Sequence, residues 1–285
     1  MATDWRELPE PPPLPGLYAR ALLRRGIRGR CLPDLGLRCP VSVEPEHLAR
    51  YRDICAFDDD ARLPPTYPHV LAFALQLQLL GDPAFPFPLL GLVHLENRIR
   101  VLRQLAGLGP FTISVHTADL RPHAKGAQFS LITRLEDQLG LLWEGDSAIL
   151  CRGLTLAGPP PDHQAFPELA LSELAHWQAP ADIGRRYARI AGDYNPIHLS
   201  ALSARLFGFP RAIAHGLWNK ARCLAALGQQ LPPAGYAIEV RFQKPVLLPA
   251  ELRLLASAPA AQGQGQLRLL GGDDLPHMVG RWKAL

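Results

Sequence analysis

The sequence predicts an α+β fold built from two repeats, in which each repeat wraps an antiparallel sheet round one central helix. Its 285 residues suffice for two domains of ordinary size. The same order of helices and strands recurs in both halves, and a proline cluster separates them near the middle.

Two proline-rich segments set the expected domain boundaries. Residues 1–16 are predicted to be a proline-rich leader, because PEPPPLP favours extended, polyproline-like backbone. Residues 158–162 (GPPPD) are expected to be a linker. The N-terminal repeat then covers residues 17–157 and the C-terminal repeat residues 163–285.

Matching elements recur in the two halves. A short helix is expected at 43–51 and again at 179–187, each leading into a loop. A long apolar helix follows, beginning near Tyr67 in the first half and near Ile213 in the second. Alternating apolar, β-branched and aromatic residues predict the strands, at 90–102, 111–119, 128–136 and 141–152 and then at 236–255, 252–257, 266–270 and 278–283.

Composition indicates a soluble globular protein with a large core, since 48% of residues are hydrophobic and 20% charged. The net charge of +4 comes mainly from arginine, with an early cluster at residues 20–30. A solvated surface is the favoured interpretation of this cluster, and attraction of an anionic carrier is the alternative. Nucleic-acid binding is not expected, because no recognition motif accompanies the charge.

The expected location is cytoplasmic. The five cysteines are scattered without a CxxC pair, which favours reduced thiols and neither a disulfide framework nor a zinc site. Acidic residues at 4, 7 and 10 do not fit a secretory or transit signal. The longest apolar run, residues 70–80, is too short to cross a bilayer, so no membrane segment is expected.

The most informative segment is Gly192-Asp193-Tyr194-Asn195-Pro196-Ile197-His198. Gly192 and Asn195-Pro196 favour successive turns, so Asp193 and His198 are expected to converge on one spot. A carboxylate and an imidazole that share one water can take a proton from it and return that proton. Asn195 is expected to orient the water or a side chain, and Gly192 to lie in the substrate site.

A second element, Ala214-His215-Gly216, precedes an apolar helix. An N–H at a helix start has no intrahelical partner, and Gly216 lets a substrate carbonyl approach it closely. Such a donor contributes about 3 kcal/mol in a transition state. His215 is assigned to the substrate site, with a structural hydrogen bond favoured over a catalytic role because His69 occupies the matching place in the first half.

These residues allow two other interpretations. The motif can be a structural turn in which the Asp caps a helix. Asp193, His198 and His215 can also be metal ligands, but no further carboxylate or cysteine stands at suitable spacing, so no metal is expected. The first half lacks ten residues here and has Phe57 in place of Asp193. Its long helix is then core, or lines a channel for an apolar substrate.

Residues Tyr187 to Ala204 resemble the signature of the MaoC-like (R)-specific enoyl-CoA hydratases and 3-hydroxyacyl-thioester dehydratases. An aromatic residue precedes G-D-x-N-P-[aliphatic]-H, and five further residues separate this histidine from Ala204. GFPRAIAHGL continues the similarity through Gly216. The two-repeat layout and residues 63–99 are similar to the double hotdog members, whose N-terminal hotdog is degenerate.

This resemblance implies that Asp193 and His198 add water across a trans-2-enoyl thioester to give an (R)-3-hydroxyacyl thioester. Asn195 would support them, and Gly216 would bind the thioester oxygen. No cofactor is implied, because coenzyme A or acyl carrier protein is part of the substrate. Arg241, Lys244 or the early arginine cluster is predicted to meet its phosphates. A monomer and a homodimer both remain open.

Two alternative functions differ in testable features. A hotdog thioesterase needs a carboxylate on the central helix, and residues 217–227 contain neither Asp nor Glu. A non-catalytic acyl-thioester-binding partner subunit would resemble the first half, whereas the second half keeps both the acid and the base.

Overall fold

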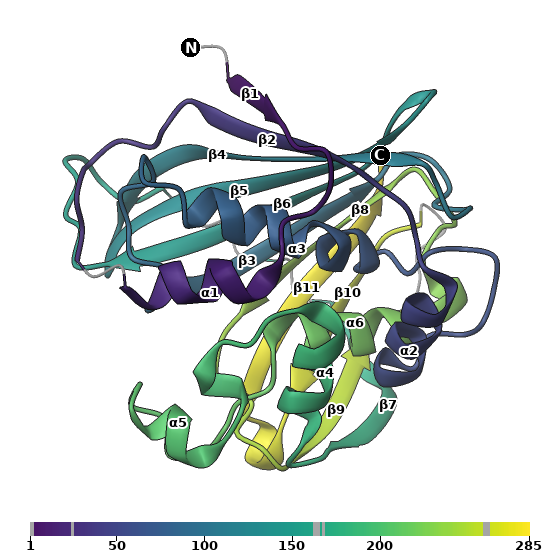
Figure 1. Ribbon diagram of the computed structural model, residues 1–285. Helices are drawn as coiled ribbons and strands as arrows, with labels where there is room; N and C mark the ends of the chain where they lie inside the picture. Colours follow the sequence, from purple (N-terminus) through teal and green to yellow (C-terminus); the bar gives the residue numbers. More distant parts are fainter. Residues whose placement is uncertain (1–2, 24–25, 162–165, 167–168, 259–262) are drawn as a thin grey trace.

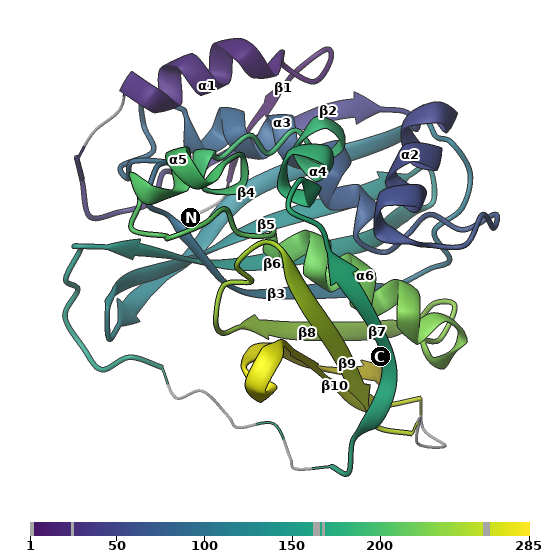
Figure 2. The ribbon, with the colours of Figure 1, turned by 90° about the horizontal axis from the view of Figure 1, so that it is seen from below.

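The computed structural model describes residues 1–285 except 1–2, 24–25, 162–165, 167–168 and 259–262. Eleven strands form one continuous sheet in the order β1-β2-β4-β5-β6-β3-β8-β11-β10-β9-β7. The two repeats join where β3 (Val93–Val101) pairs antiparallel with β8 (Tyr236–Phe242). Figures 1 and 2 show the sheet curving round the helices. The predicted α+β class with two helix-wrapped repeats is confirmed.

The first repeat contains five strands and two helices of the described chain. They are β2 (Leu35–Val41), α2 (Pro45–Cys55), α3 (Tyr67–Leu80), β3, β4 (Phe111–His123), β5 (Gly126–Asp137) and β6 (Gly140–Arg152). The second repeat follows a similar order. It contains β7 (Ser172–Ala179), α4 (Ile183–Ala191), the 3₁₀ turn η1 (Pro196–His198), α5 (Ala201–Arg205), α6 (Gly216–Leu227), the turn η2 (Gly228–Gln230), β8, β9 (Ala250–Ala256), β10 (Gly265–Leu270), the turn η3 (Gly272–Asp274) and β11 (Pro276–Ala284).

The long helices and the predicted strands are present, with two kinds of difference. The strand expected over 236–255 is divided into β8 and β9, and Pro245 and Pro249 lie between them, where proline cannot donate to a ladder. The strands β2 and β7, which open the two repeats, were not predicted. Each contains residues that are weak strand formers, such as the glycine and proline of β2.

The two long helices are apolar because the sheet surrounds them. Leu75 and Leu79 of α3 are fully buried, as are Ala221 and Cys223 of α6. A helix that is apolar on several faces is typical of a protein interior. Both helices are therefore packed on several sides by the sheet. This packing determines where the start of α6, at Gly216, lies.

The short helices α2 and α4 bind the repeats together. The Trp218 indole N–H of α6 donates to the Ile54 carbonyl at 2.9 Å. An imidazole nitrogen of His47 lies 2.9 Å from the carbonyl oxygen of Ile190. The Tyr51 and Tyr187 rings pack with their centroids 6.3 Å apart. These contacts seat the degenerate repeat directly against the helix that leads into the Asp193 loop.

The segment expected to be an extended leader is more ordered than its composition predicts. β1 (Asp4–Glu7) pairs parallel with β2 at the sheet edge. The helix α1 (Leu14–Leu23) then begins inside the expected leader and packs against α3. Proline in a first helical turn leaves no required N–H unpaired. Edge pairing and the burial of Leu17 thus outweigh the extended preference of this segment. Of the expected linker, Asp162 lies outside the described residues.

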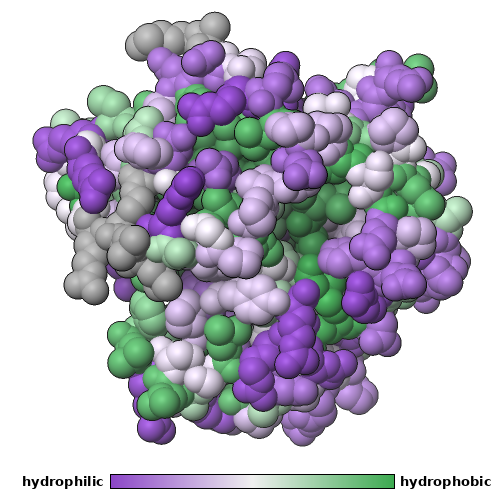
Figure 3. Space-filling view, in the orientation of Figure 1, coloured by the Kyte–Doolittle hydropathy of each residue, from purple (hydrophilic) through white to green (hydrophobic). Residues whose placement is uncertain are grey.

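Several large apolar side chains of the described residues are exposed. No described helix is both long enough and apolar enough to cross a membrane. The five cysteines are free, and all except Cys31 are buried. Figure 3 shows apolar side chains over α5 at the lower left, where Leu202 and Leu206 are 76% and 81% exposed. Within the early arginine cluster, Arg24 and Arg25 lie outside the described residues.

Candidate active site

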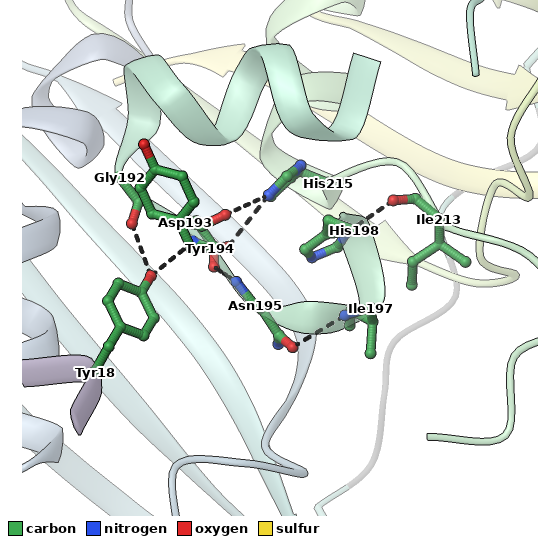
Figure 4. A network of polar contacts seen from close by, with 9 residues as sticks. All are labelled: Tyr18, Gly192, Asp193, Tyr194, Asn195, Ile197, His198, Ile213 and His215. Carbon is green, nitrogen blue, oxygen red and sulfur yellow. Dashed lines mark hydrogen bonds and ion pairs between the residues drawn. The ribbon is translucent and has the colours of Figure 1, made fainter. Parts of the chain in front are cut away.

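The loop between α4 and α6 brings three predicted residues together (Figure 4). One ligand-type atom each from Asp193, His198 and His215 lies within 4.8 Å of the others. A water with hydrogen bonds of about 2.8 Å bridges two acceptors up to roughly 4.6 Å apart at a tetrahedral angle. The carboxylate and the imidazole thus lie at about the separation that one shared water bridges.

Short-range sequence features build this loop. α4 ends at Gly192, which adopts the left-handed conformation at φ 77°. Pro196 begins η1, and the Asn195 side-chain oxygen accepts from the Ile197 N–H at 3.5 Å. The Asn195 N–H donates to Asp193 Oδ1 at 3.2 Å. Asn195 is thus a turn residue that also holds the carboxylate.

His198 presents one ring nitrogen to the site. Its Nδ1–H donates to the Ile213 carbonyl at 2.8 Å, so the neutral ring has its lone pair on Nε2. Burial, and then the neighbouring His215, lower the pKa of His198 to about 3. The imidazole is therefore uncharged at neutral pH, and its Nε2 lone pair can accept a hydrogen bond from water.

His215 anchors the backbone of Asp193. Its Nε2–H donates to the Asp193 carbonyl at 3.0 Å and lies 3.8 Å from Asp193 Oδ2. The ring stacks on His198 with centroids 3.6 Å apart. Burial lowers the pKa of His215 to about 4. These contacts are those of the structural role favoured from the sequence.

Gly216 is the first residue of α6 and follows the His215 cap. An added Cβ would lie 2.9 Å from Phe242 Cε1 on β8. A side chain would therefore collide with the wall of the site, and only glycine leaves the N–H approachable. As the first residue of α6, Gly216 has an N–H without an intrahelical partner at the positive end of the helix. Its oxyanion role stays a prediction.

The two predicted phosphate-binding residues lie elsewhere. Arg241 lies 3.1 Å from Glu96 and 3.4 Å from Glu239, and its charge is neutralised there. Successive strand residues face opposite sides, so Arg241 is directed away from the side on which Phe242 meets Gly216. These ion pairs argue against a phosphate contact for Arg241, whose role stays a prediction. Lys244 is exposed beyond the end of β8, and its role stays a prediction.

The three-residue group has a composition that can bind metal, but its geometry fits a metal poorly. The His198 and His215 rings are stacked with 24° between their planes. Lone pairs lie in the ring planes, so those of two stacked rings do not converge on one ion. One nitrogen of each ring is also engaged with a backbone carbonyl.

One functional residue could not be found from the sequence. The Tyr18 hydroxyl of α1 lies 2.7 Å from the Gly192 carbonyl oxygen and 2.7 Å from the Tyr194 nitrogen. It comes from the segment next to the expected leader, 174 residues from Gly192. Nothing in the local pattern around Tyr18 signals this contact, because sheet pairing at β1 and packing of α1 create it.

Acid is expected to destabilise the protein through its buried histidines. The folded pKa values of His198 and His215, about 3 and about 4, lie below the 6.5 of an unfolded chain. Between pH 6.5 and 4 the unfolded chain binds more protons, so the free energy of unfolding falls as pH falls. His69 and His94 act in the same direction. Each histidine contributes up to about 1.4 kcal/mol per pH unit.

Urea unfolding at several pH values between 7 and 4 measures this slope. His215→Asn should lower the slope by up to one proton, whereas His176→Asn, at a side chain that is 81% exposed, should leave it unchanged. A slope that stays the same in His215→Asn would mean that this imidazole is charged in the folded protein.

Comparison with known proteins agrees with this site. A family model described as MaoC like domain matches residues 162–266. The 3-hydroxyacyl-thioester dehydratase X of Mycobacterium tuberculosis is 35% identical over 225 residues, covering 78% of each chain. The crystal structure of HtdX from Mycobacterium tuberculosis has a TM-score of 0.76 and 30% identity, and covers 88% of this chain and all of that one.

The peroxisomal enoyl-CoA hydratase 2 of Arabidopsis thaliana is 25% identical over 173 residues, which is 54% of each chain. The structural similarity to HtdX extends over 88% of this chain, so it includes parts of both repeats. The fold is the predicted double hotdog, and the chain belongs to the MaoC-like dehydratase family.

Proposed function

We propose that the protein reversibly hydrates trans-2-enoyl thioesters to (R)-3-hydroxyacyl thioesters, and so acts as a hydro-lyase. The observation that carries the proposal is the spacing of the Asp193 carboxylate and the His198 imidazole, within 4.8 Å of each other. The names of the similar proteins, a thioester dehydratase and an enoyl-CoA hydratase, support the same reaction.

In the hydration direction, the Asp193 carboxylate and His198 Nε2 hold one water. The water oxygen bonds to C3 as its O–H bond breaks, and the pair receives the proton. The pair then protonates C2, so one water is added without any change in oxidation state. The Gly216 N–H donates to the thioester oxygen, which gains charge when the C2–C3 double bond opens.

No metal and no redox cofactor takes part in this proposal, because the carboxylate and imidazole perform both proton transfers. Coenzyme A and acyl carrier protein present the same thioester to these groups, and either is a candidate carrier. The five cysteines are free thiols, which suits a protein that works in a reducing compartment such as the cytoplasm. One chain supplies both repeats, so a homodimer is not needed to complete the site.

The alternatives have less support. A hotdog thioesterase would need an acid on the central helix, and α6 reads GLWNKARCLAAL. A binding subunit without activity would not need the acid and base held at the site. The degenerate repeat fits that description better, because Phe57 stands in its matching loop and packs on Tyr51.

The test follows the absorbance of the conjugated enoyl thioester. Crotonyl-CoA and longer trans-2-enoyl-CoA substrates should lose this absorbance on addition of the protein, and the product should be the (R)-3-hydroxyacyl isomer on chiral analysis. Pre-incubation with a chelator should leave the rate unchanged. Release of free thiol without loss of the double bond would instead identify a thioesterase.

A further inference from the structure

The hydroxyl of Tyr18 forms hydrogen bonds with the catalytic loop on both sides of Asp193. It donates to the Gly192 carbonyl and accepts from the Tyr194 N–H, both at 2.7 Å. Figure 4 shows the phenol approaching this loop from α1, on the side away from His198. The two peptide groups that flank Asp193 are therefore bound to a single atom.

The helix α1 is itself firmly seated beside this loop. Leu17 is buried, and α1 packs on α3. Leu14 approaches Gly192 so closely that an added Cβ there would lie 2.9 Å from its Cδ1. The Tyr18 and Tyr194 rings also pack edge to face, with centroids 6.1 Å apart. The packing of α1 and of the Tyr18 ring thus determines the position of the Tyr18 hydroxyl beside the loop.

The loop needs an external partner at this place. Gly192 turns the chain out of α4 in the left-handed conformation, so its carbonyl and the Tyr194 N–H have left the helical ladder. These two groups also contact each other, at 3.2 Å, which is longer than either bond to Tyr18. Loss of the two shorter bonds would favour a rearrangement of this half-buried loop. Burial, and then the charge of Asp193, raise the pKa of Tyr18, so the hydroxyl keeps the proton that it donates.

We infer that Tyr18 is a positioning residue, which sets the Asp193 carboxylate relative to His198 by holding the peptides on either side of it. The inference rests on the proposed function. His215, at the start of α6, binds the Asp193 carbonyl at 3.0 Å. Together with the two bonds from Tyr18, the backbone round Asp193 thus has three hydrogen bonds to side chains outside the loop turn. Tyr18 supplies two of them from the N-terminal segment.

Tyr18→Phe removes both hydrogen bonds and keeps the ring. A displacement of about 1 Å in a catalytic group can cost on the order of 100-fold in rate. We expect kcat for hydration of an enoyl-CoA to fall about 10-fold, with KM changed less than about 2-fold, because the Tyr18 hydroxyl binds the loop backbone on the side away from His198. Ala19→Ser changes an exposed neighbour of Tyr18 on the same helix, and its rate should stay near wild type.

A double-mutant cycle separates positioning from general damage. If Tyr18 acts through Asp193, Tyr18→Phe should lower the residual rate of Asp193→Asn less than about 2-fold. If the two effects multiply, with a full 10-fold loss in both backgrounds, Tyr18 does not act through this carboxylate and the inference is overturned.

A readout without activity keeps the inference separate from the proposed function. Amide hydrogen exchange at Tyr194 should be at least 10-fold faster in Tyr18→Phe than in the wild type, with little change in the central strands. An active wild type with unchanged exchange and kcat in Tyr18→Phe would overturn the inference alone. An inactive wild type in which exchange still depends on Tyr18 would overturn the proposed reaction and leave Tyr18 as a loop anchor.

Discussion

Asp193→Asn is expected to lower kcat for enoyl-thioester hydration at least ~100-fold, the usual size of a general acid–base contribution. The amide has the size of the carboxylate, and its oxygen can still accept from the Asn195 N–H that now binds Asp193 Oδ1 at 3.2 Å. The loop is therefore expected to keep its conformation. The amide cannot take a proton from water, so the loss falls on the chemical step.

Steady-state kinetics with an enoyl-CoA substrate measure this loss, with KM expected to change little. Asp58→Asn is the matched control, because Asp58 is an exposed acid beside Phe57 in the corresponding loop of the first repeat. It should leave kcat unchanged. Near-wild-type turnover in Asp193→Asn would remove this carboxylate from the mechanism and leave the histidines of the loop as candidate bases.

His198→Ala is expected to lower kcat by a similar factor, at least ~100-fold. His198 Nε2 is a neutral acceptor, because Nδ1–H is committed to the Ile213 carbonyl and burial lowers the pKa of the ring to about 3. Alanine removes this acceptor. It also removes the ring that stacks on His215 at 3.6 Å, so some loss of stability is expected as well.

The His198→Ala experiment therefore needs a folding control. His198→Gln keeps a polar side chain near the space of the ring, and both variants should show cooperative thermal unfolding with far-UV circular dichroism like that of the wild type. His176→Ala, at an exposed position on β7, should retain full kcat. A well-folded His198→Gln with wild-type turnover would contradict the role assigned to the imidazole.

The Asp193 loop could be predicted because its determinants are local. Gly192 permits a left-handed turn, and Pro196 starts the next one. His198 then returns toward Asp193, only five residues away. The apolar pattern of α3 and α6 similarly required a surrounding sheet. The family signature added the reaction to this framework.

Strands β2 and β7 could not be predicted because their residues have weak strand propensity and owe their conformation to pairing with β4 and β9.

The positions of the charged residues depended on contacts distant in sequence. Arg241 looked available for a phosphate, but β3 from the other repeat places Glu96 directly opposite it. The pKa of His198 depends on burial under neighbouring elements and on the stacked His215, whereas the sequence could offer only the ordinary value. In both cases the charge state is set by neighbours that strand register and helix packing provide.

The sequence by itself determined two helix-wrapped repeats and a loop whose acid and base converge, because turns and apolar periodicity act over a few residues. The tertiary structure alone decided which groups surround that loop. It directed Arg241 to carboxylates, kept His198 uncharged and brought Tyr18 across 174 residues to the Gly192 carbonyl. The physical reason is that electrostatics and hydrogen bonding depend on distance in space, and that distance is fixed by sheet pairing between segments far apart in the chain.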